Sequence, residues 1–380
     1  MSGLHVYVLI DALGWELIRE RPFLAGFLGH QQALRTLLGF SSGIIPSILT
    51  GRTPAENEMW NLVYYDPEHS PFRGMRKLGR LPALLDNRIG RRALTEIGRR
   101  ILGMGSNFDV SVPPQILPWF HWAESRNIYA RNGIPGQQSI FDLLHEKGVG
   151  QKIYSYKDRT TDQEILKRAT HDIANGNEEV FFLYLSEFDM FLHLHRAEPA
   201  SIAAKLAWYE EELGRVFEAA QRRNSGACLR VFSDHGMTPV VRHCDMAAAV
   251  DGCGFRMPDD YLAVYDSTMA RFWFFSDAAR EAICARLGQL DYARVLSDDE
   301  LHGFGVYFAD HRYGELVALL DPGCIVAEGG FNGKGWKPAG MHGYHPDDAN
   351  SSAVFLSSDA PREAPRSVRD VFGIMQEALV

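Results

Sequence analysis

Apolar runs that end abruptly in polar residues recur along the chain, and they indicate its architecture. Four such runs are followed directly by Asp or Ser: His5–Ile10 before Asp11, Val180–Leu185 before Ser186, Leu229–Phe232 before Ser233, and Ala353–Leu356 before Ser357. Continuous apolar runs of this length suit strands that are buried on both faces, as in a parallel sheet.

Helical patterns lie between these runs. Ser139 and Asp142 form a start resembling a capping box for a helix over Ile140–Lys147. Two further segments each keep one apolar helical face. Their apolar positions are Ile202, Leu206, Tyr209, Leu213, Val216 and Ala220 in one segment, and Val368, Val371, Phe372, Met375 and Leu379 in the other. Strands that alternate with helices predict a layered α/β fold.

Two stretches interrupt this alternation. Residues 63–135 contain basic helix-like pieces and aromatic loops. Residues 250–338 contain strand-like pieces at Tyr261–Tyr265, Phe272–Phe275 and Val306–Phe308. We interpret both stretches as insertions near the C-terminal edge of the sheet, where they form a cap over the site. The core is then expected in three parts, residues 1–62, 136–249 and 339–380.

Candidate metal ligands follow the predicted strands. Ligands of an open parallel sheet bind beyond the carboxyl ends of its strands. The residues placed there are Asp11, Asp189 with His193, Asp234 with His235, and, in a Gly-rich loop near the C-terminus, His342. The spacing of Asp189 and His193 puts both on one face of a helix. Each residue alone is as well explained by a cap, a turn or a solvated imidazole, and we read His195 and His345 in that way. Together, three carboxylates and three imidazoles suit two divalent ions.

A candidate nucleophile lies in a segment that begins Ser41-Ser42-Gly43 and continues to Thr50-Gly51 and Pro54. A serine hydroxyl is a poor nucleophile at neutral pH and needs a base or a metal to ionise it. A helix N-terminus beside a cation would stabilise the alkoxide. The alternative is a serine-rich helix cap, which we would prefer if the metal ligands were missing.

Composition narrows the class of partner. The 380 residues are 46% hydrophobic and 23% charged, and the formal net charge is −9. With no long basic run, neither a nucleic-acid polymer nor a membrane is expected as a partner, although a small anionic substrate is compatible. Five scattered cysteines without a CxxC pair, and an N-terminus without a signal-peptide pattern, predict a reduced, cytoplasmic protein. The oligomeric state stays open.

The order of these residues resembles the alkaline phosphatase superfamily, and within it the type I phosphodiesterase/nucleotide pyrophosphatase branch. The resemblance extends from the first strand to the last helix. It implies a three-layer α/β/α sandwich around a mostly parallel sheet, with the insertions as a small cap. It also implies one metal on Asp189, His193 and His342. The other metal would lie on Asp11, Asp234, His235 and the nucleophile.

The resemblance also ranks the residues of the nucleophile segment. The family's nucleophile precedes its Thr-Gly pair by nine residues, which selects Ser41 over Ser42. Asn61 falls where the branch has an Asn that contacts a phosphate oxygen, although a turn after Trp60 explains it equally well. Two positions depart from the branch. Asn57 replaces its usual His, and Gly43 replaces its usual Pro.

The implied activity is hydrolysis of a small phosphate ester by two ions, Zn²⁺ first and Mn²⁺ second, through a phosphoseryl or nucleotidyl-seryl intermediate on Ser41. One alternative is a phosphomonoesterase or phosphomutase on the same core. It needs extra cations, for which the candidates are Arg52, Lys334 and Lys337. The other alternative is a non-catalytic binder of a phosphorylated ligand. Four aromatic residues either stack on a base or sugar or fill a cap core: Trp119, Phe120, Trp122 and Tyr129.

Overall fold

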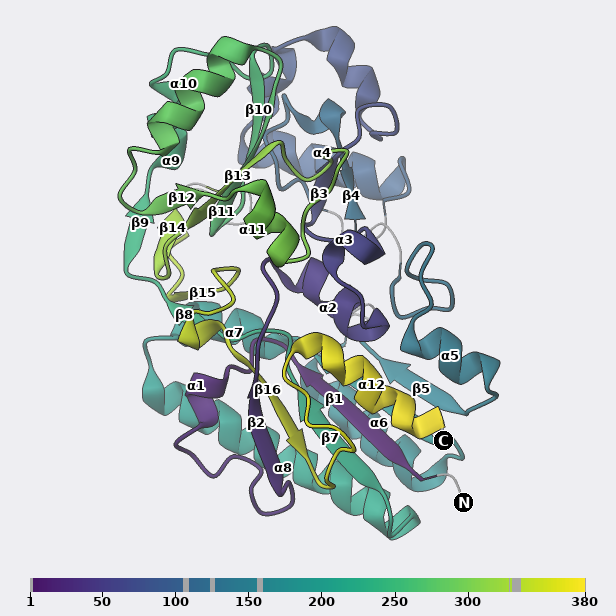
Figure 1. The fold of residues 1–380 in the computed structure, drawn as a ribbon. Coiled ribbons are helices and arrows are strands. Elements are labelled where there is room, and N and C mark those ends of the chain that lie inside the picture. The colour runs from purple at the N-terminus through teal and green to yellow at the C-terminus, as the bar shows by residue number, and fades with distance from the viewer. Residues whose placement is uncertain are drawn as a thin grey trace.

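The computed structural model describes residues 3–104, 109–123, 127–155, 160–327, 329 and 336–379, so Lys334 lies outside the described residues. Figure 1 shows a main sheet with helices in the lower half of the molecule and a second, smaller assembly above it. None of the helices within the described ranges is both long enough and apolar enough to cross a membrane.

The main sheet has six strands, and the apolar runs of the sequence form four of them. Its order is β2 (His30–Leu34), β16 (Ala353–Ser357), β7 (Cys228–Phe232), β1 (His5–Ile10), β6 (Val180–Leu185) and β5 (Gln151–Tyr154). The last four are mutually parallel, whereas β16 runs antiparallel to both β7 and β2. The mostly parallel sheet is therefore confirmed, but the parallel reading of Ala353–Leu356 is wrong. Burial on both faces, which the sequence does reveal, does not depend on strand direction.

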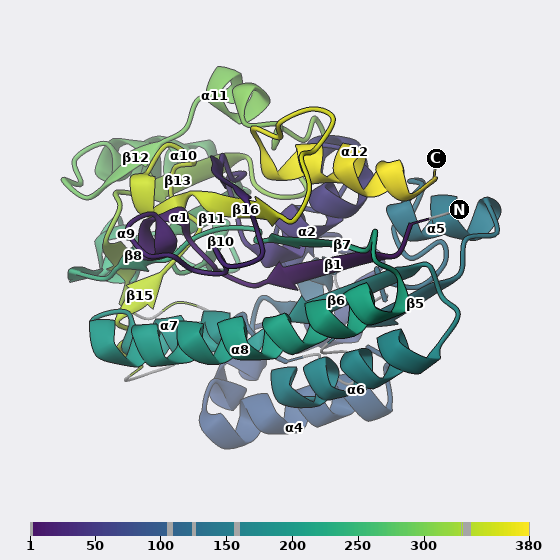
Figure 2. The same ribbon diagram turned by 90° about the horizontal axis from the view of Figure 1, so that it is seen from below.

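Helices cover both faces of this sheet. On one face, Val6, Val8 and Ile10 of β1 pack with residues of α6 (Asp162–Asn175) and α8 (Pro199–Arg223). On the other face, Tyr7 and Leu9 pack with α2 (Ser41–Thr50), α5 (Ile140–Glu146) and α12 (Val371–Gln376). Alternate residues of a strand point to opposite faces, so one strand supplies two cores. Figure 2 shows the sheet between these helix layers, which confirms the three-layer sandwich.

The predicted helices form largely where the sequence places them. Ser139 caps α5 with a complete capping box through Asp142. All six apolar positions predicted for one face of α8 are buried. The predicted C-terminal helix is divided, because a 3-10 turn at Val368–Asp370 precedes α12 and another at Glu377–Leu379 follows it.

The two predicted insertions build one assembly. A four-stranded antiparallel sheet has the order β10 (Tyr261–Tyr265), β11 (Met269–Phe274), β13 (Leu316–Leu320) and β12 (Ala293–Val295). Two helices accompany it, α10 (Asp277–Leu287) and α11 (Asp298–Gly303). From the first insertion come the pair β3 (Val63–Tyr65) and β4 (Phe120–Trp122), together with α4 (Arg88–Arg100). One hydrophobic cluster joins Val63, Phe120 and Trp122 to Leu262 and Trp273, so the two insertions share a core.

The structure decides two sequence interpretations within or beside this assembly. The strand predicted at Val306–Phe308 is wrong, because the segment is irregular and turns its side chains into the cluster around Trp60 and Tyr313. The four aromatic candidates belong to cores. Phe120 and Trp122 are buried in the shared cluster, with Trp119 packed against it, and Tyr129 is buried in the main core beside Tyr184.

Short elements complete the chain and connect the two assemblies. They are α1 (Trp15–Ile18), α3 (Pro54–Asn57), α7 (Glu187–His195), α9 (Met246–Asp251), the pair β8 (Thr238–Pro239) and β15 (Gly340–Met341), and the pair β9 (Arg242–Cys244) and β14 (Cys324–Val326).

Candidate active site

Strand direction brings the predicted ligands to one edge of the main sheet. Asp11 follows β1, Asp234 follows β7, and α7 follows β6, so all three leave at the carboxyl ends of parallel strands. His342 reaches the same edge because it precedes β16. That strand is antiparallel to β7 and begins where β7 ends.

Asp11, Asp234 and His235 form one compact group, with donor atoms that all lie within 4.8 Å of one another. His235 Nε2 is 3.2 Å from Asp234 Oδ2 and 3.5 Å from Asp11 Oδ1. The backbone turns sharply after Asp11, since Ala12 has a left-handed φ of 62°. This conformation is uncommon for a residue other than glycine. It places the Ala12 N–H 3.2 Å from Asp234 Oδ1, to which it donates.

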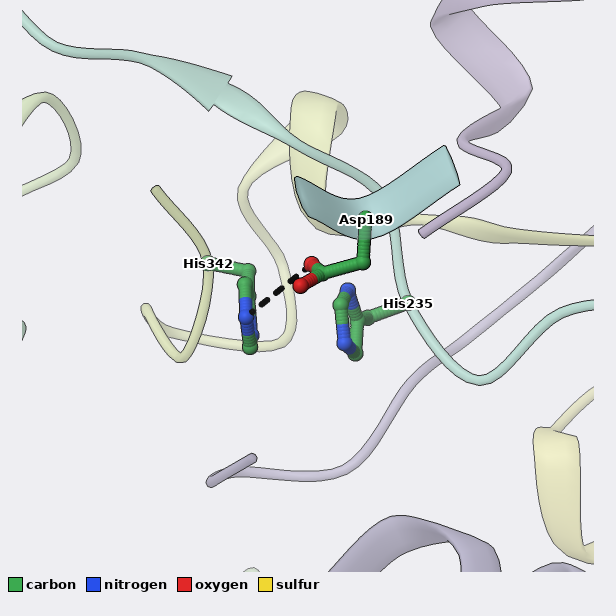
Figure 3. Close-up of side chains that lie close together, drawn as sticks. All are labelled: Asp189, His235 and His342. Atoms are coloured by element: carbon green, nitrogen blue, oxygen red, sulfur yellow. Dashed lines mark ion pairs between the residues drawn. The ribbon is translucent and has the colours of Figure 1, made fainter. Parts of the chain in front are cut away.

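Asp189, His235 and His342 form the second group, again with donor atoms within 4.8 Å (Figure 3). His342 Nε2 lies 3.4 Å from Asp189 Oδ1, and the rings of His235 and His342 stack at 3.8 Å. His193 is one turn along α7 from Asp189, and its Nε2 lies 3.3 Å from Asp189 Oδ2. The structure thus brings all six predicted ligands together. His235 lies in both groups.

Backbone carbonyls orient two of the imidazoles. His193 Nδ1 is 2.8 Å from the carbonyl oxygen of Gly340, and His235 Nδ1 is 2.9 Å from that of Gly236. A carbonyl oxygen only accepts, so each Nδ1 carries a proton and donates it, which leaves Nε2 as the ring nitrogen that faces the site. This arrangement is usual for histidines that bind metals.

Burial and neighbouring charges shift the pKa values of several site residues. Burial, and then the neighbouring carboxylates of Asp234 and Asp189, raise the pKa of Asp11 well above its ordinary value. Burial alone would also raise the pKa of Asp189, but the surrounding imidazoles outweigh it and lower that pKa. Burial, followed by repulsion from His235, lowers the pKa of His342 and keeps its ring neutral.

Several polar atoms at the site are buried without any hydrogen bond to a described residue. They are Asp11 Oδ1, Asp189 Oδ1, Asp234 Oδ2 and His342 Nδ1. Leaving such atoms unpaired costs about 1–3 kcal/mol each, and more for charged groups. Their chemistry, carboxylate oxygen with imidazole nitrogen, fits divalent metal ions. The residues present therefore fit a metal centre.

Ser41 stands beside this centre, at the first position of α2. Its Oγ lies 3.0 Å from His235 Nε2, and the residue is only partly buried, so a ligand can reach it. Ser42 points elsewhere and donates to the Trp60 carbonyl oxygen at 3.3 Å. Of the two serines, the structure places Ser41 at the predicted ligands.

The two departures from the family pattern have local explanations. A Cβ on Gly43 would lie 2.2 Å from the Trp60 carbonyl oxygen, so the backbone of Trp60 passes directly against α2. Asn57 is fully buried and donates from Nδ2 to Ser47 Oγ at 3.1 Å, while its Oδ1 accepts from Met59 N–H at 2.9 Å. Ser47 in turn donates to the Gly43 carbonyl oxygen. Asn57 thus holds α2 to the segment that leads to Asn61.

Asn61 is fully buried and makes one weak contact with a described side chain. Its Nδ2 lies 3.5 Å from Met269 Sδ, and its Oδ1 has no hydrogen bond among the described residues. Thioether sulfur is a poor acceptor. The amide is therefore available to a ligand that reaches this position.

The other candidate cations and imidazoles that fall within the described residues lie outside the two groups. His195 pairs with Glu198 at 3.0 Å, and His345 faces Asp347 at 3.8 Å. Arg52 follows α2 at the end opposite Ser41, where it faces Glu56. Lys337 is exposed next to Trp336, whose ring lies 5.6 Å from that of His193.

Sequence reasoning missed two supporting residues. The Tyr184 hydroxyl, on the penultimate residue of β6, donates to Asp11 Oδ2. Asp162, at the start of α6, accepts from the Ser186 and Glu187 N–H groups and so fixes the beginning of α7. Tyr184 lies inside an apolar run and Asp162 reads as a helix-start residue, so neither carries a sequence signal for this role.

Comparison with known proteins gives one family and one fold. Residues 6–345 match the family model for type I phosphodiesterase/nucleotide pyrophosphatase. No curated protein sequence matches the chain. Human ectonucleotide pyrophosphatase/phosphodiesterase 5 is 12% identical, with a TM-score of 0.68 over 99% of this chain and 94% of that one. The murine protein is 16% identical, with a TM-score of 0.66 over 99% and 95%. The inactive variant of the murine protein in complex with AMP is 15% identical, with a TM-score of 0.67 over 99% of this chain and 95% of that one.

Proposed function

Since the chain belongs to the type I phosphodiesterase/nucleotide pyrophosphatase family of metal-dependent phosphoester hydrolases, we propose that it cleaves a small phosphate diester through a covalent intermediate on Ser41. The observation that carries this proposal is the 3.0 Å separation of Ser41 Oγ from His235 Nε2, at a helix N-terminus beside two groups of ligand-type side chains. The AMP bound to the murine neighbour supports a nucleotide as substrate or product.

Asp11, Asp234 and His235 would hold one divalent ion, and Asp189, His193 and His342 the other. Mixed carboxylate and imidazole ligands favour Zn²⁺ first and Mn²⁺ second. Bound there, the ions would lower the pKa of the Ser41 hydroxyl and offset the charge on the phosphoryl oxygens.

The chain's own residues perform the remaining tasks. Ser41 Oγ releases its proton to solvent and attacks phosphorus. A new P–O bond forms to the serine, the ester P–O bond breaks, and the leaving group departs with the electron pair of that bond. The N-terminal amides and dipole of α2 stabilise the developing alkoxide and the phosphoryl charge. Water then hydrolyses the seryl ester and restores the Ser41 hydroxyl.

Asn61 would donate from Nδ2 to a phosphoryl oxygen. The contact that it gives up, to Met269 Sδ at 3.5 Å, is weak. A preorganised donor of this kind is worth on the order of 3 kcal/mol in the transition state.

Phosphomonoesterase activity is the less favoured reading of the same site. A monoester carries one more negative charge, so it needs additional cations near phosphorus. Arg52 follows the ten-residue α2 at its far end, about 15 Å along the helix from Ser41. This distance favours a diester with one charge at the scissile phosphate.

Parallel assays of bis(p-nitrophenyl) phosphate and p-nitrophenyl phosphate test the proposal. We expect preference for the diester, loss of activity on chelation, and recovery with Zn²⁺ or Mn²⁺. Ser41→Ala should lower kcat by at least about 1000-fold with metal content unchanged, and Ser42→Ala is the matched control. Near-native turnover by Ser41→Ala would show that the nucleophile is assigned wrongly. A preference for the monoester would overturn the substrate class.

A further inference from the structure

A surface outside the active site combines basic and apolar side chains. It consists of residues 73–102, which form the 3-10 turns η1 (Arg73–Leu78) and η2 (Leu81–Leu85) and the helix α4, and we call it the basic–apolar face. These three elements pack against one another in chain order. We propose that the basic–apolar face binds the surface of a membrane that contains anionic phospholipids.

Exposed apolar side chains concentrate on this face. Of the twelve exposed large hydrophobic residues in the described chain, eight lie between Leu78 and Leu102. Ile89 is 81% exposed, Leu84 76% and Ile101 74%. Single exposed apolar residues are ordinary on any protein, but a contiguous group marks an interaction site.

Helix geometry gathers part of this group into a stripe. Every fourth residue of the segment from Ile89 to Ile101 is apolar and exposed. Residues four apart lie on one side of an α-helix, so these side chains form one row. The other side of α4 buries Leu94 and Gly98, and Leu94 belongs to the core that the two insertions share, which fixes the outward direction of the row.

The same face is strongly basic, although the whole chain has a net charge of −9. Residues 73–102 contain nine Lys or Arg and only two Asp or Glu. The two acidic residues, Asp86 and Glu96, pair with arginines of the face itself. Exposed cations such as Arg88 and Arg92 form no ion pair with a described residue. The negative net charge of the whole chain, from which no membrane partner is expected, conceals this local excess of positive charge.

Charge and shape favour a lipid surface over other occupants. An amphipathic helix with a Lys/Arg-rich polar side and Leu or Ile beside it lies in the plane of a membrane interface. Each cation near an anionic leaflet adds attraction. A symmetric contact with a second copy would instead place two strongly basic faces against each other. In Figures 1 and 2, α4 lies at the periphery of the molecule, so docking there leaves the site at the sheet edge open.

Vesicle co-sedimentation tests the charge component. We expect the purified full chain to bind vesicles of mixed phosphatidylcholine and phosphatidylserine but not vesicles of pure phosphatidylcholine. High salt should release the chain from the mixed vesicles. Replacing Arg73, Arg88 and Arg92 together by Gln should weaken binding on the order of 100-fold. The matched control replaces three exposed arginines elsewhere by Gln and should bind like the wild type: Arg222, Arg362 and Arg366.

The apolar component has its own variant. Leu84→Ser with Ile89→Ser should also weaken vesicle binding by at least about tenfold. The control is Val241→Ser with Phe275→Ser, since both residues are exposed and lie outside the face. All variants should keep wild-type hydrolysis of bis(p-nitrophenyl) phosphate, or an unchanged melting temperature if that ester is not a substrate, which shows that they fold.

Three results would overturn the proposal. The first is no binding to anionic vesicles at low salt. The second is equal loss of binding in the face variants and their controls. The third is a dimer in sedimentation velocity that only the face variants abolish, because it would identify the occupant as a second copy of the chain.

Discussion

Gly43→Ala is a small change with a large expected effect on the nucleophile segment. The added Cβ would meet the Trp60 carbonyl oxygen at 2.2 Å and the Trp60 carbonyl carbon and Cα at 2.9 Å. Contacts below 3.0 Å essentially do not occur at a Cβ, and the obstructing atoms are backbone. The Trp60–Asn61 segment and α2 must therefore separate by about 1 Å at this point, which is the scale of backbone shift produced by overpacking.

Two magnitudes follow from this displacement. Overpacking a close contact lowers the free energy of unfolding by about 1–3 kcal/mol. Ser41 lies two residues before Gly43 and Asn61 directly after Trp60, so their relative position changes as well. A misplacement of about 1 Å between reacting groups lowers turnover on the order of 100-fold.

Urea unfolding and steady-state kinetics with bis(p-nitrophenyl) phosphate measure the two effects separately. Gly373→Ala is the matched control, since a Cβ on this glycine of α12 meets nothing within 4 Å. Alanine there should raise stability by up to about 1 kcal/mol and leave kcat unchanged. If Gly43→Ala retains both the stability and the kcat of the wild type, the close packing of Trp60 on α2 does not position the nucleophile.

Three further predictions concern the supports of the site. Asn57→Ala removes the partner of the buried Met59 N–H and should lower the free energy of unfolding by about 2–4 kcal/mol, measured by urea titration. Burial raises the pKa of Asp162 to about 6 from an ordinary 3.8. The folded state therefore binds this proton more tightly than the unfolded state does. The free energy of unfolding should fall by about 3 kcal/mol as the pH rises from about 4 to 6, and Asp162→Asn should remove this pH dependence. Chelation should lower the melting temperature, because Asp11 and Asp234 lose their counter-charge and bound metal stabilises the fold by mass action.

Each of these has an outcome that contradicts it. Asn175→Ala removes an exposed amide that donates to a helix carbonyl, so an equal loss there would show that burial of Asn57 is irrelevant. A pH slope identical in wild type and Asp162→Asn would exclude that carboxyl as its source. A melting temperature that changes neither with chelator nor with added Zn²⁺ or Mn²⁺ would contradict the presence of a metal centre.

The core of the fold is predictable from the sequence because its signals are local. Runs such as Val180–Leu185 reveal burial on both faces, and the Ser139 box reveals a helix start. The direction of β16 is set by the path of the chain after His342, which no window of residues contains. The segment Val306–Phe308 has an apolar composition like that of a strand but is buried as an irregular loop, and only tertiary packing separates these outcomes.

The site was predictable as a set of residues and less so as an arrangement. Strand ends explain why Asp11, Asp189 and Asp234 meet. The position of His235 in both compact groups, with His193 beside them, depends on side-chain geometry that spacing does not encode. The assignment of each ligand to one ion stays a prediction. The basic pieces of the first insertion were visible in the sequence, but the exposure of the apolar residues between them depends on tertiary packing.

The most direct test of the account is to trap the enzyme during turnover and find the modified residue by mass spectrometry. Metal-replete protein is mixed rapidly with bis(p-nitrophenyl) phosphate, quenched in acid and digested. We predict a nitrophenyl-phosphoryl group on Ser41, formed within the first turnover and absent from Ser41→Ala. An active enzyme that carries the group on another residue, or none under conditions where release limits turnover, would contradict the central claim that Ser41 is the nucleophile.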